Sequence, residues 1–231
     1  MTSVFMGNLI AAHFLERVNR FLCTVLLLDE VIRVHLPDPG RLTELLIPET
    51  KVLLRPEKNP SRKTQYDLVG IYTEGTLVCC DTRIPNNLVK KALQEKTISN
   101  LPDYQKIIPE YTYEHSRIDF CLDERILIEV KGVSLVKNGL ALFPDAPTER
   151  GRKHVETLIK ALEEGFQSHI IFIVQRPDAY QFIPNAETDP SFAEIMKEAI
   201  NKGVIPLVYT SEFAGTYIYL RDRIPFKRYF T

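Results

Sequence analysis

Short apolar runs separated by polar turns fill the first third of the chain. Asp29-Glu30 and Glu74-Gly75 suit hairpin turns between consecutive runs. Residues 42–46, which follow a Pro-Gly pair, are expected to form one short helix. Several short strands interrupted by a helix, within about 80 residues, predict a small β-barrel. The expected strands are residues 25–28, 31–34, 52–54 and 75–80.

The pattern changes near residue 83, where helical and strand-like segments begin to alternate. Thr148 is expected to cap a helix whose apolar residues recur at helical spacing and which ends at Gly165. Residues 170–174 are apolar on both faces, as in a central strand. This order predicts an α/β (α+β) domain with a mixed sheet over residues 84–231, after a barrel domain over residues 1–83. The other expected elements are a helix over 87–98, a hairpin over 117–131, a helix over 191–201 and a strand over 204–209.

The hairpin carries the strongest candidate chemistry. Asp119 lies in its first strand, and Glu129 and Lys131 lie in its second. Side chains alternate between the two faces of a strand, so Glu129 and Lys131 share a face, and pairing would bring Asp119 beside Glu129. Two carboxylates next to an ammonium group suit Mg²⁺ or Mn²⁺, with the lysine acting on a water or on developing charge. The alternative is a solvated face of an amphipathic hairpin.

Composition narrows the class of protein. The chain has 231 residues, of which 45% are hydrophobic and 26% charged, and its formal net charge is −1. These values are ordinary for a soluble globular protein, and this charge does not by itself predict nucleic-acid binding. No apolar run is long enough to span a bilayer and no signal peptide is recognisable, so we expect a cytoplasmic protein. The four cysteines lack zinc-site spacing and are expected to be buried, reduced thiols.

Basic residues gather in two places. Arg150, Arg152, Lys153 and His154 occupy the first two turns of the capped helix. Cations there oppose the helix dipole, which favours contact with phosphate over neutralisation by nearby acids. His154 is expected to be structural, with a supporting role beside the hairpin left open. In the N-terminal part, four arginines could line one groove and contact backbone phosphate: Arg17, Arg20, Arg33 and Arg41.

Two further residues have open interpretations. Asp145 lies in a Pro-bounded loop beyond the hairpin, where it could be a further metal or water ligand or a turn former. Phe21 could stack on a base, and a core position is at least as good an interpretation.

Several of these segments together resemble the sugar fermentation stimulation protein A family. The resemblance implies an N-terminal OB-like β-barrel followed by a domain similar to PD-(D/E)-x-K nucleases. It also implies DNA binding with little sequence preference and a regulatory link to sugar metabolism. Asp119, Glu129 and Lys131 match nuclease-type positions, and Glu95 matches an acidic residue on the preceding helix. Asp38 departs from the asparagine usual in the family, and an acid there would weaken a phosphate contact. The matching segments are residues 17–21, 35–41 with 44–46, 116–120, 128–131 and 143–154.

The sequence therefore predicts a DNA-binding protein with a metal-dependent phosphodiesterase centre. The expected ligands of Mg²⁺ or Mn²⁺ are Asp119, Glu129 and Asp145, with Lys131 and Glu95 as further catalytic residues. The other hypothesis is a non-catalytic DNA-binding regulator whose nuclease-like fold is only a scaffold. DNA is the expected partner, no membrane is involved, and a homodimer is possible. The expected DNA contacts are Arg17, Arg20, Arg33, Arg41, Arg150, Arg152 and Lys153.

Overall fold

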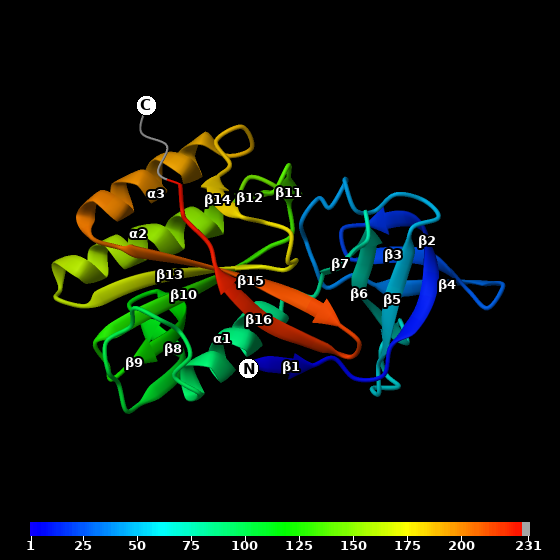
Figure 1. Cartoon of the computed structure of the whole chain (residues 1–231), viewed down its shortest axis with the longest axis horizontal. Helices are drawn as coiled ribbons and strands as arrows, with labels where there is room; N and C mark the ends of the chain where they lie inside the picture. Colours follow the sequence, from blue (N-terminus) through cyan, green and yellow to red (C-terminus); the bar gives the residue numbers. More distant parts are fainter. Residues whose placement is uncertain (228–231) are drawn as a thin grey trace.

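Two sheets of different kinds organise the protein, as a computed structural model that describes residues 1–227 shows (Figure 1). The expected second domain ends at residue 231, so its last four residues lie outside the described part. A six-stranded, mainly antiparallel sheet forms the first domain, and a seven-stranded mixed sheet with helices on both faces forms the second. This is the expected architecture of an OB-like barrel followed by an α/β domain with a mixed sheet.

The first domain is a closed barrel. Its strand order is β4-β3-β2-β5-β6-β7, and a parallel pairing of His35 with Asp67 joins β4 to β6 and closes the ring. The alternating apolar residues of these strands form a core inside the barrel, around Phe14, Val25 and Leu54. The strands are β2 (Ile10–Asn19), β3 (Leu22–Leu27), β4 (Glu30–His35), β5 (Lys51–Pro56), β6 (Tyr66–Thr73) and β7 (Thr76–Cys79).

The second domain is a sheet with helices on both sides. Its strand order is β1-β16-β15-β13-β10-β9-β8, with parallel pairing of β10, β13 and β15 at the centre. Helix α1 (Ile84–Gln94) packs on one face, while α2 (Glu149–Glu163) and α3 (Pro190–Lys202) pack on the other (Figure 1). The strands are β1 (Ser3–Phe5), β8 (Ile107–Tyr113), β9 (Ser116–Leu122), β10 (Ile126–Val133), β13 (Gln167–Val174), β15 (Ile205–Ala214) and β16 (Tyr217–Arg223).

A small third sheet, β11-β12-β14, flanks this domain. It consists of β11 (Val136–Lys137), β12 (Leu140–Phe143) and β14 (Gln181–Pro184). Within residues 1–227, none of the helices is long and apolar enough to cross a bilayer.

The two domains are tied together at several points. Strand β1 pairs with β16, so residues 3–5 join the second sheet although they lie within the range expected for the barrel. At the other side of the junction, the backbone N–H of Cys79 donates to the Gln175 carbonyl (3.0 Å), and Gln175 Nε2 donates to the Cys79 carbonyl (2.7 Å). These contacts fix how the barrel sits on the sheet.

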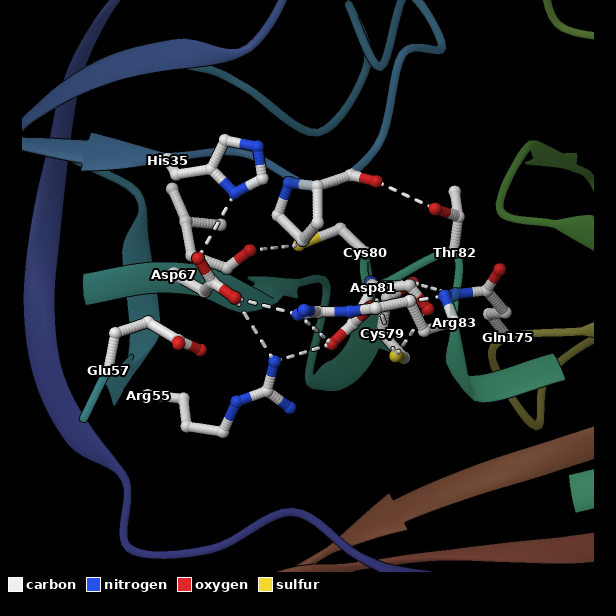
Figure 2. A network of polar contacts seen from close by, with 12 residues as sticks. His35, Arg55, Glu57, Asp67, Cys79, Cys80, Asp81, Thr82, Arg83 and Gln175 are labelled. Atoms are coloured by element: carbon white, nitrogen blue, oxygen red, sulfur yellow. Dashed lines mark hydrogen bonds and ion pairs between the residues drawn. The ribbon is translucent and has the colours of Figure 1, made fainter. Parts of the chain in front are cut away.

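A buried ionic network reinforces the junction (Figure 2). Asp67 and Asp81 are almost fully buried at the end of the barrel. Arg83, the residue before α1, donates to both carboxylates, with Nη2–Oδ2 distances of 2.7 Å to Asp67 and 2.8 Å to Asp81. Arg55 also contacts both (3.2 and 2.7 Å), and Arg62 contacts Asp67 (2.8 Å). The network thus links two barrel strands to the start of the helix of the second domain.

The sequence located most elements but missed some. The hairpin, the helix capped by Thr148 and the strand at residues 170–174 are confirmed, and all four cysteines are buried and unpaired. The expected helix at residues 42–46 is wrong: this segment makes a single turn, in which Leu46 N–H donates to the Leu42 carbonyl (2.8 Å). The turn is held by burial of Leu42 and Leu45 in the barrel core rather than by helix propagation. The strands that were not anticipated are β1, β2, β6, β8, β11, β12, β14 and β16.

Candidate metal centre and interdomain cleft

The hairpin of β9 and β10 brings Asp119 to the backbone beside Glu129. Pairing in the register Ile128 with Phe120 ends one step before these two residues would meet. Beyond this point a side chain takes over from backbone pairing: Asp119 Oδ2 accepts a hydrogen bond from the Val130 N–H (2.7 Å). Its other oxygen, Oδ1, accepts from Asn86 Nδ2 in the first turn of α1 (2.6 Å). Asp119 is therefore fixed by two donors from two elements.

Glu129 is the most deeply buried acid of the cluster, with 1% of the residue exposed. Its Oε1 contacts Lys131 Nζ (2.5 Å) and also His154 Nδ1 in the second turn of α2. Its Oε2 is buried and has no hydrogen-bond partner. A buried carboxylate oxygen without a partner is costly, so Oε2 is suited to binding a cation.

The two carboxylates influence each other's ionisation. Burial and then the charge of Glu129 raise the pKa of Asp119 above its usual value. Burial also opposes ionisation of Glu129, but the charge of Lys131 and the contact with His154 outweigh it and lower its pKa. Glu129 is therefore firmly ionised, whereas the ionised form of Asp119 is disfavoured unless a cation lies nearby.

The structure does not bring every expected residue to this pair. Glu95 lies at the far end of α1, where its Oε2 accepts from Thr2 Oγ1 (2.5 Å). Asp145 Oδ2 accepts from the Arg41 N–H (2.9 Å), at the loop that follows β4. Within residues 1–227, no group of three or more His, Cys, Asp or Glu side chains is placed to hold a metal ion together.

Two residues beside the carboxylates were not assigned a firm role from the sequence. Asn86 is an ordinary polar residue at the start of a helix, and nothing in its local pattern points to Asp119. His154 lies on the buried side of α2, and its alignment with Glu129 depends on how the helix packs on β10. The only local sign that these two residues lie near the site was the cluster of polar residues at the N-termini of both helices.

A cleft between the domains lies beside the cluster. We use the term interdomain cleft for a cavity of about 340 Å³ whose lining includes Arg20, Gly40, Asn86, Lys131, Asp145 and Arg150. The barrel loop approaches the second domain closely here: a Cβ on Gly40 would lie 2.2 Å from Asp145 Oδ2. A larger cavity of about 560 Å³ lies between β14 and α3. Neither cavity has Asp119 or Glu129 in its lining, but the interdomain cleft is lined by their neighbours Asn86 and Lys131.

Side-chain hydrogen bonds to its backbone hold the loop that follows β4. Arg17 donates from its Nη1 atom to the carbonyls of Gly40 (2.7 Å) and Arg41 (2.6 Å) and from its Nη2 atom to that of Arg20 (2.8 Å). The Asp38 carboxylate accepts from the Gly40 N–H (2.8 Å), and burial raises the pKa of Asp38 to about 6. Arg17 and Asp38 therefore hold the loop in place, and neither presents its charged group outward.

The other basic candidates fall into two groups. Arg152 pairs with Asp189, the N-cap residue of α3 (2.6 Å), and Lys153 pairs with Glu149 (2.8 Å). The four remaining candidates are exposed and form no ion pair with an acid within residues 1–227: Arg20, Arg33, Arg41 and Arg150. Arg20 and Arg150 line the interdomain cleft from opposite domains.

Comparison with known proteins decides the family. Residues 15–80 match the family model described as "SfsA N-terminal OB domain", and residues 83–216 match "Sugar fermentation stimulation protein RE domain". The chain belongs to the sugar fermentation stimulation protein family. Relatives called sugar fermentation stimulation protein homologs include one from Clostridium kluyveri, 42% identical, which aligns over 96% of this chain and 98% of the relative. One from a Thermoanaerobacter species is 37% identical over the same shares.

A solved structure of a family member has the same fold. The Pyrococcus furiosus SfsA structure superimposes with a TM-score of 0.90 at 28% identity, over 99% of this SfsA-family chain and 100% of the other. That protein is described as a complex with Ca²⁺.

Proposed function

We propose that this SfsA-family protein binds DNA with little sequence preference and hydrolyses phosphodiester bonds with Mg²⁺ or Mn²⁺. The observation that carries the proposal is Glu129 Oε2, a buried carboxylate oxygen without a partner, next to Asp119 and Lys131. The Ca²⁺ complex of the Pyrococcus furiosus relative supports a metal in this family, because Ca²⁺, Mg²⁺ and Mn²⁺ all favour carboxylate oxygens.

The residues divide into ligands and supports. Asp119 and Glu129 would hold the cation, which supplies Lewis acidity and a more acidic bound water. Asn86 holds Asp119, and His154 holds Glu129 Oε1, so that Oε2 stays available. Lys131 would stabilise the negative charge that develops on the phosphate oxygens. Hydrolysis forms a bond from a water oxygen to phosphorus and breaks a phosphorus–oxygen ester bond. The departing oxygen takes up a proton and becomes a hydroxyl.

DNA binding rests on the barrel and on the exposed arginines. OB domains bind nucleic-acid strands through grooves that follow the backbone. Arg20 and Arg150 face the same cleft from the two domains, so one strand could contact both. Such contacts release counterions, and log K should fall with log salt by about 0.9 per phosphate on duplex or about 0.7 on single strands. Binding that is insensitive to salt, or that depends strongly on one base sequence, contradicts this model.

Cleavage is tested on labelled DNA of single-stranded, duplex and branched form, with Mg²⁺, Mn²⁺ or EDTA. We expect metal-dependent products that disappear in Glu129→Ala and persist in Glu95→Ala, whose carboxylate lies at the far end of α1. Both variants should keep DNA affinity. Absence of cleavage with every metal and substrate, or cleavage that survives Glu129→Ala, rejects the catalytic proposal.

One observation favours a second candidate function. Among residues 1–227 only two carboxylates gather at the centre, and Lys131 and His154 already contact one of them. A DNA-binding regulator without turnover would need no more than this. It predicts salt-sensitive binding that is unchanged by metal and by Glu129→Ala.

A further inference from the structure

An exposed aromatic platform lies on the barrel surface next to the interdomain cleft. Phe21 has 46% of its surface exposed, and its ring stacks on the His35 ring with centroids 6.3 Å apart and planes at 22°. The Arg20 guanidinium lies over the same Phe21 ring, 5.5 Å from its centroid. An exposed ring flanked by an imidazole and a guanidinium is suited to a nucleobase, which can stack while the cation meets the phosphate.

The platform is held in place by polar contacts. Asp67, part of the buried network, contacts His35 Nδ1 at 3.0 Å and so orients the imidazole (Figure 2). The Phe21 N–H donates to Asn19 Oδ1 (3.0 Å), and Arg20 Nε donates to the Pro39 carbonyl (3.3 Å). A rigid platform loses little side-chain freedom on binding, which favours affinity.

The platform is continuous with the cleft through Arg20. This residue contacts the Phe21 ring and also lines the cleft, together with Asn86 and Lys131. Lys131 contacts the buried Glu129, so a phosphate that enters the cleft lies beside the carboxylates. A cavity of about 340 Å³ lies at the lower end of the size range of small-ligand pockets, roughly 300–1,000 Å³. This size suits one nucleotide of a single strand better than a base-paired duplex.

We infer that the substrate is single-stranded DNA, which stacks a base on Phe21 and passes Arg20 into the interdomain cleft. This inference rests on the proposed function, since it names the substrate of the same centre. It also accounts for the division between the domains: the barrel captures the strand, and the second domain holds the carboxylates.

Affinity without metal is the decisive measurement. Fluorescence anisotropy in EDTA would compare labelled oligo(dT) with a duplex of equal length, so that no cleavage interferes. Phe21→Ala should weaken single-strand binding about tenfold, from the loss of one base–aromatic stack, and leave duplex binding unchanged. Phe21→Tyr keeps the ring and should bind like wild type. The matched control is Tyr217→Ala, which removes an aromatic of similar exposure (41%) from β16.

The outcomes separate this inference from the proposed function. Unchanged single-strand affinity in Phe21→Ala, or an equal loss on duplex, overturns the single-strand path, and thermal melting of each variant shows that folding is intact. A loss in Tyr217→Ala of the same size also overturns it, because affinity would then follow exposed aromatic surface in general. Absence of metal-dependent cleavage rejects only the catalytic function, since the binding measurement contains no metal. Duplex cleaved as fast as single strands by wild type rejects the inference while retaining the catalytic proposal.

Discussion

Replacing Glu129 by glutamine should remove metal-dependent stabilisation from this protein. Glu129→Gln keeps the size of the side chain, and its carbonyl oxygen can still accept the contacts from Lys131 and His154. An amide nitrogen then takes the place of Oε2, the buried oxygen without a partner, and an amide N–H₂ cannot bind a cation. The variant should fold and lose one of the two carboxylate ligands.

The expected size follows from burial and from linkage. Without metal, an amide buried without an acceptor costs about 1–3 kcal/mol. A loss of about 2 kcal/mol lowers the melting temperature of a chain of this length by roughly 4–8 °C. With metal at 100 times its dissociation constant, wild type gains about 2.7 kcal/mol of unfolding free energy. This gain corresponds to a rise of roughly 5–11 °C in melting temperature.

The assay is thermal unfolding of the full chain after EDTA treatment, with and without added Mn²⁺. Wild type should show the metal-dependent rise, and Glu129→Gln should show little of it. Glu95→Gln is the matched control, because it neutralises an exposed carboxylate at the far end of α1 and should keep the full rise. If Glu129→Gln retains the whole rise, Glu129 is not a metal ligand. If Glu95→Gln also loses the rise, the loss is not specific to Glu129 and does not identify it as a ligand.

Three further substitutions test the electrostatics. Asp119→Asn should raise stability at pH 7 without metal, measured by urea unfolding, because burial and the charge of Glu129 raise the pKa of Asp119 and its ionised form disfavours folding. A less stable variant contradicts that reasoning. For Asp67, burial opposes ionisation but hydrogen bonds from arginines and His35 outweigh it, so its pKa is lowered. Its stabilisation is therefore complete above the unfolded pKa of about 4 and lost as pH falls toward the folded value. Asp67→Asn should unfold more easily at pH 7 and show a weaker acid dependence than wild type, and equal acid dependence refutes the assignment. Lys131→Ala should keep the metal-dependent rise in melting temperature and slow cleavage at least tenfold in a single-turnover assay, and unchanged cleavage excludes it from the chemistry.

The local sequence pattern was enough to locate the strand and the helix that carry the charged residues of the site. The period of two along residues 126–131 placed Glu129 and Lys131 on one face, and the structure joins their side chains. The Thr148 cap and the apolar spacing after it located α2, and Thr148 Oγ1 accepts from the Gly151 N–H (3.1 Å) as expected. Both signals act within a few residues, so neighbouring side chains and backbone groups decide them.

The partners of those charges were decided only by the tertiary structure. Asn86 meets Asp119 because α1 packs on one face of the sheet, and His154 meets Glu129 because α2 packs on the other. Arg17 had the composition of a phosphate contact, yet the fold turns its guanidinium inward onto the loop carbonyls. Which side chain faces which depends on sheet order, helix packing and the placement of the two domains. These are set by burial of the whole core, and no short stretch of sequence contains them.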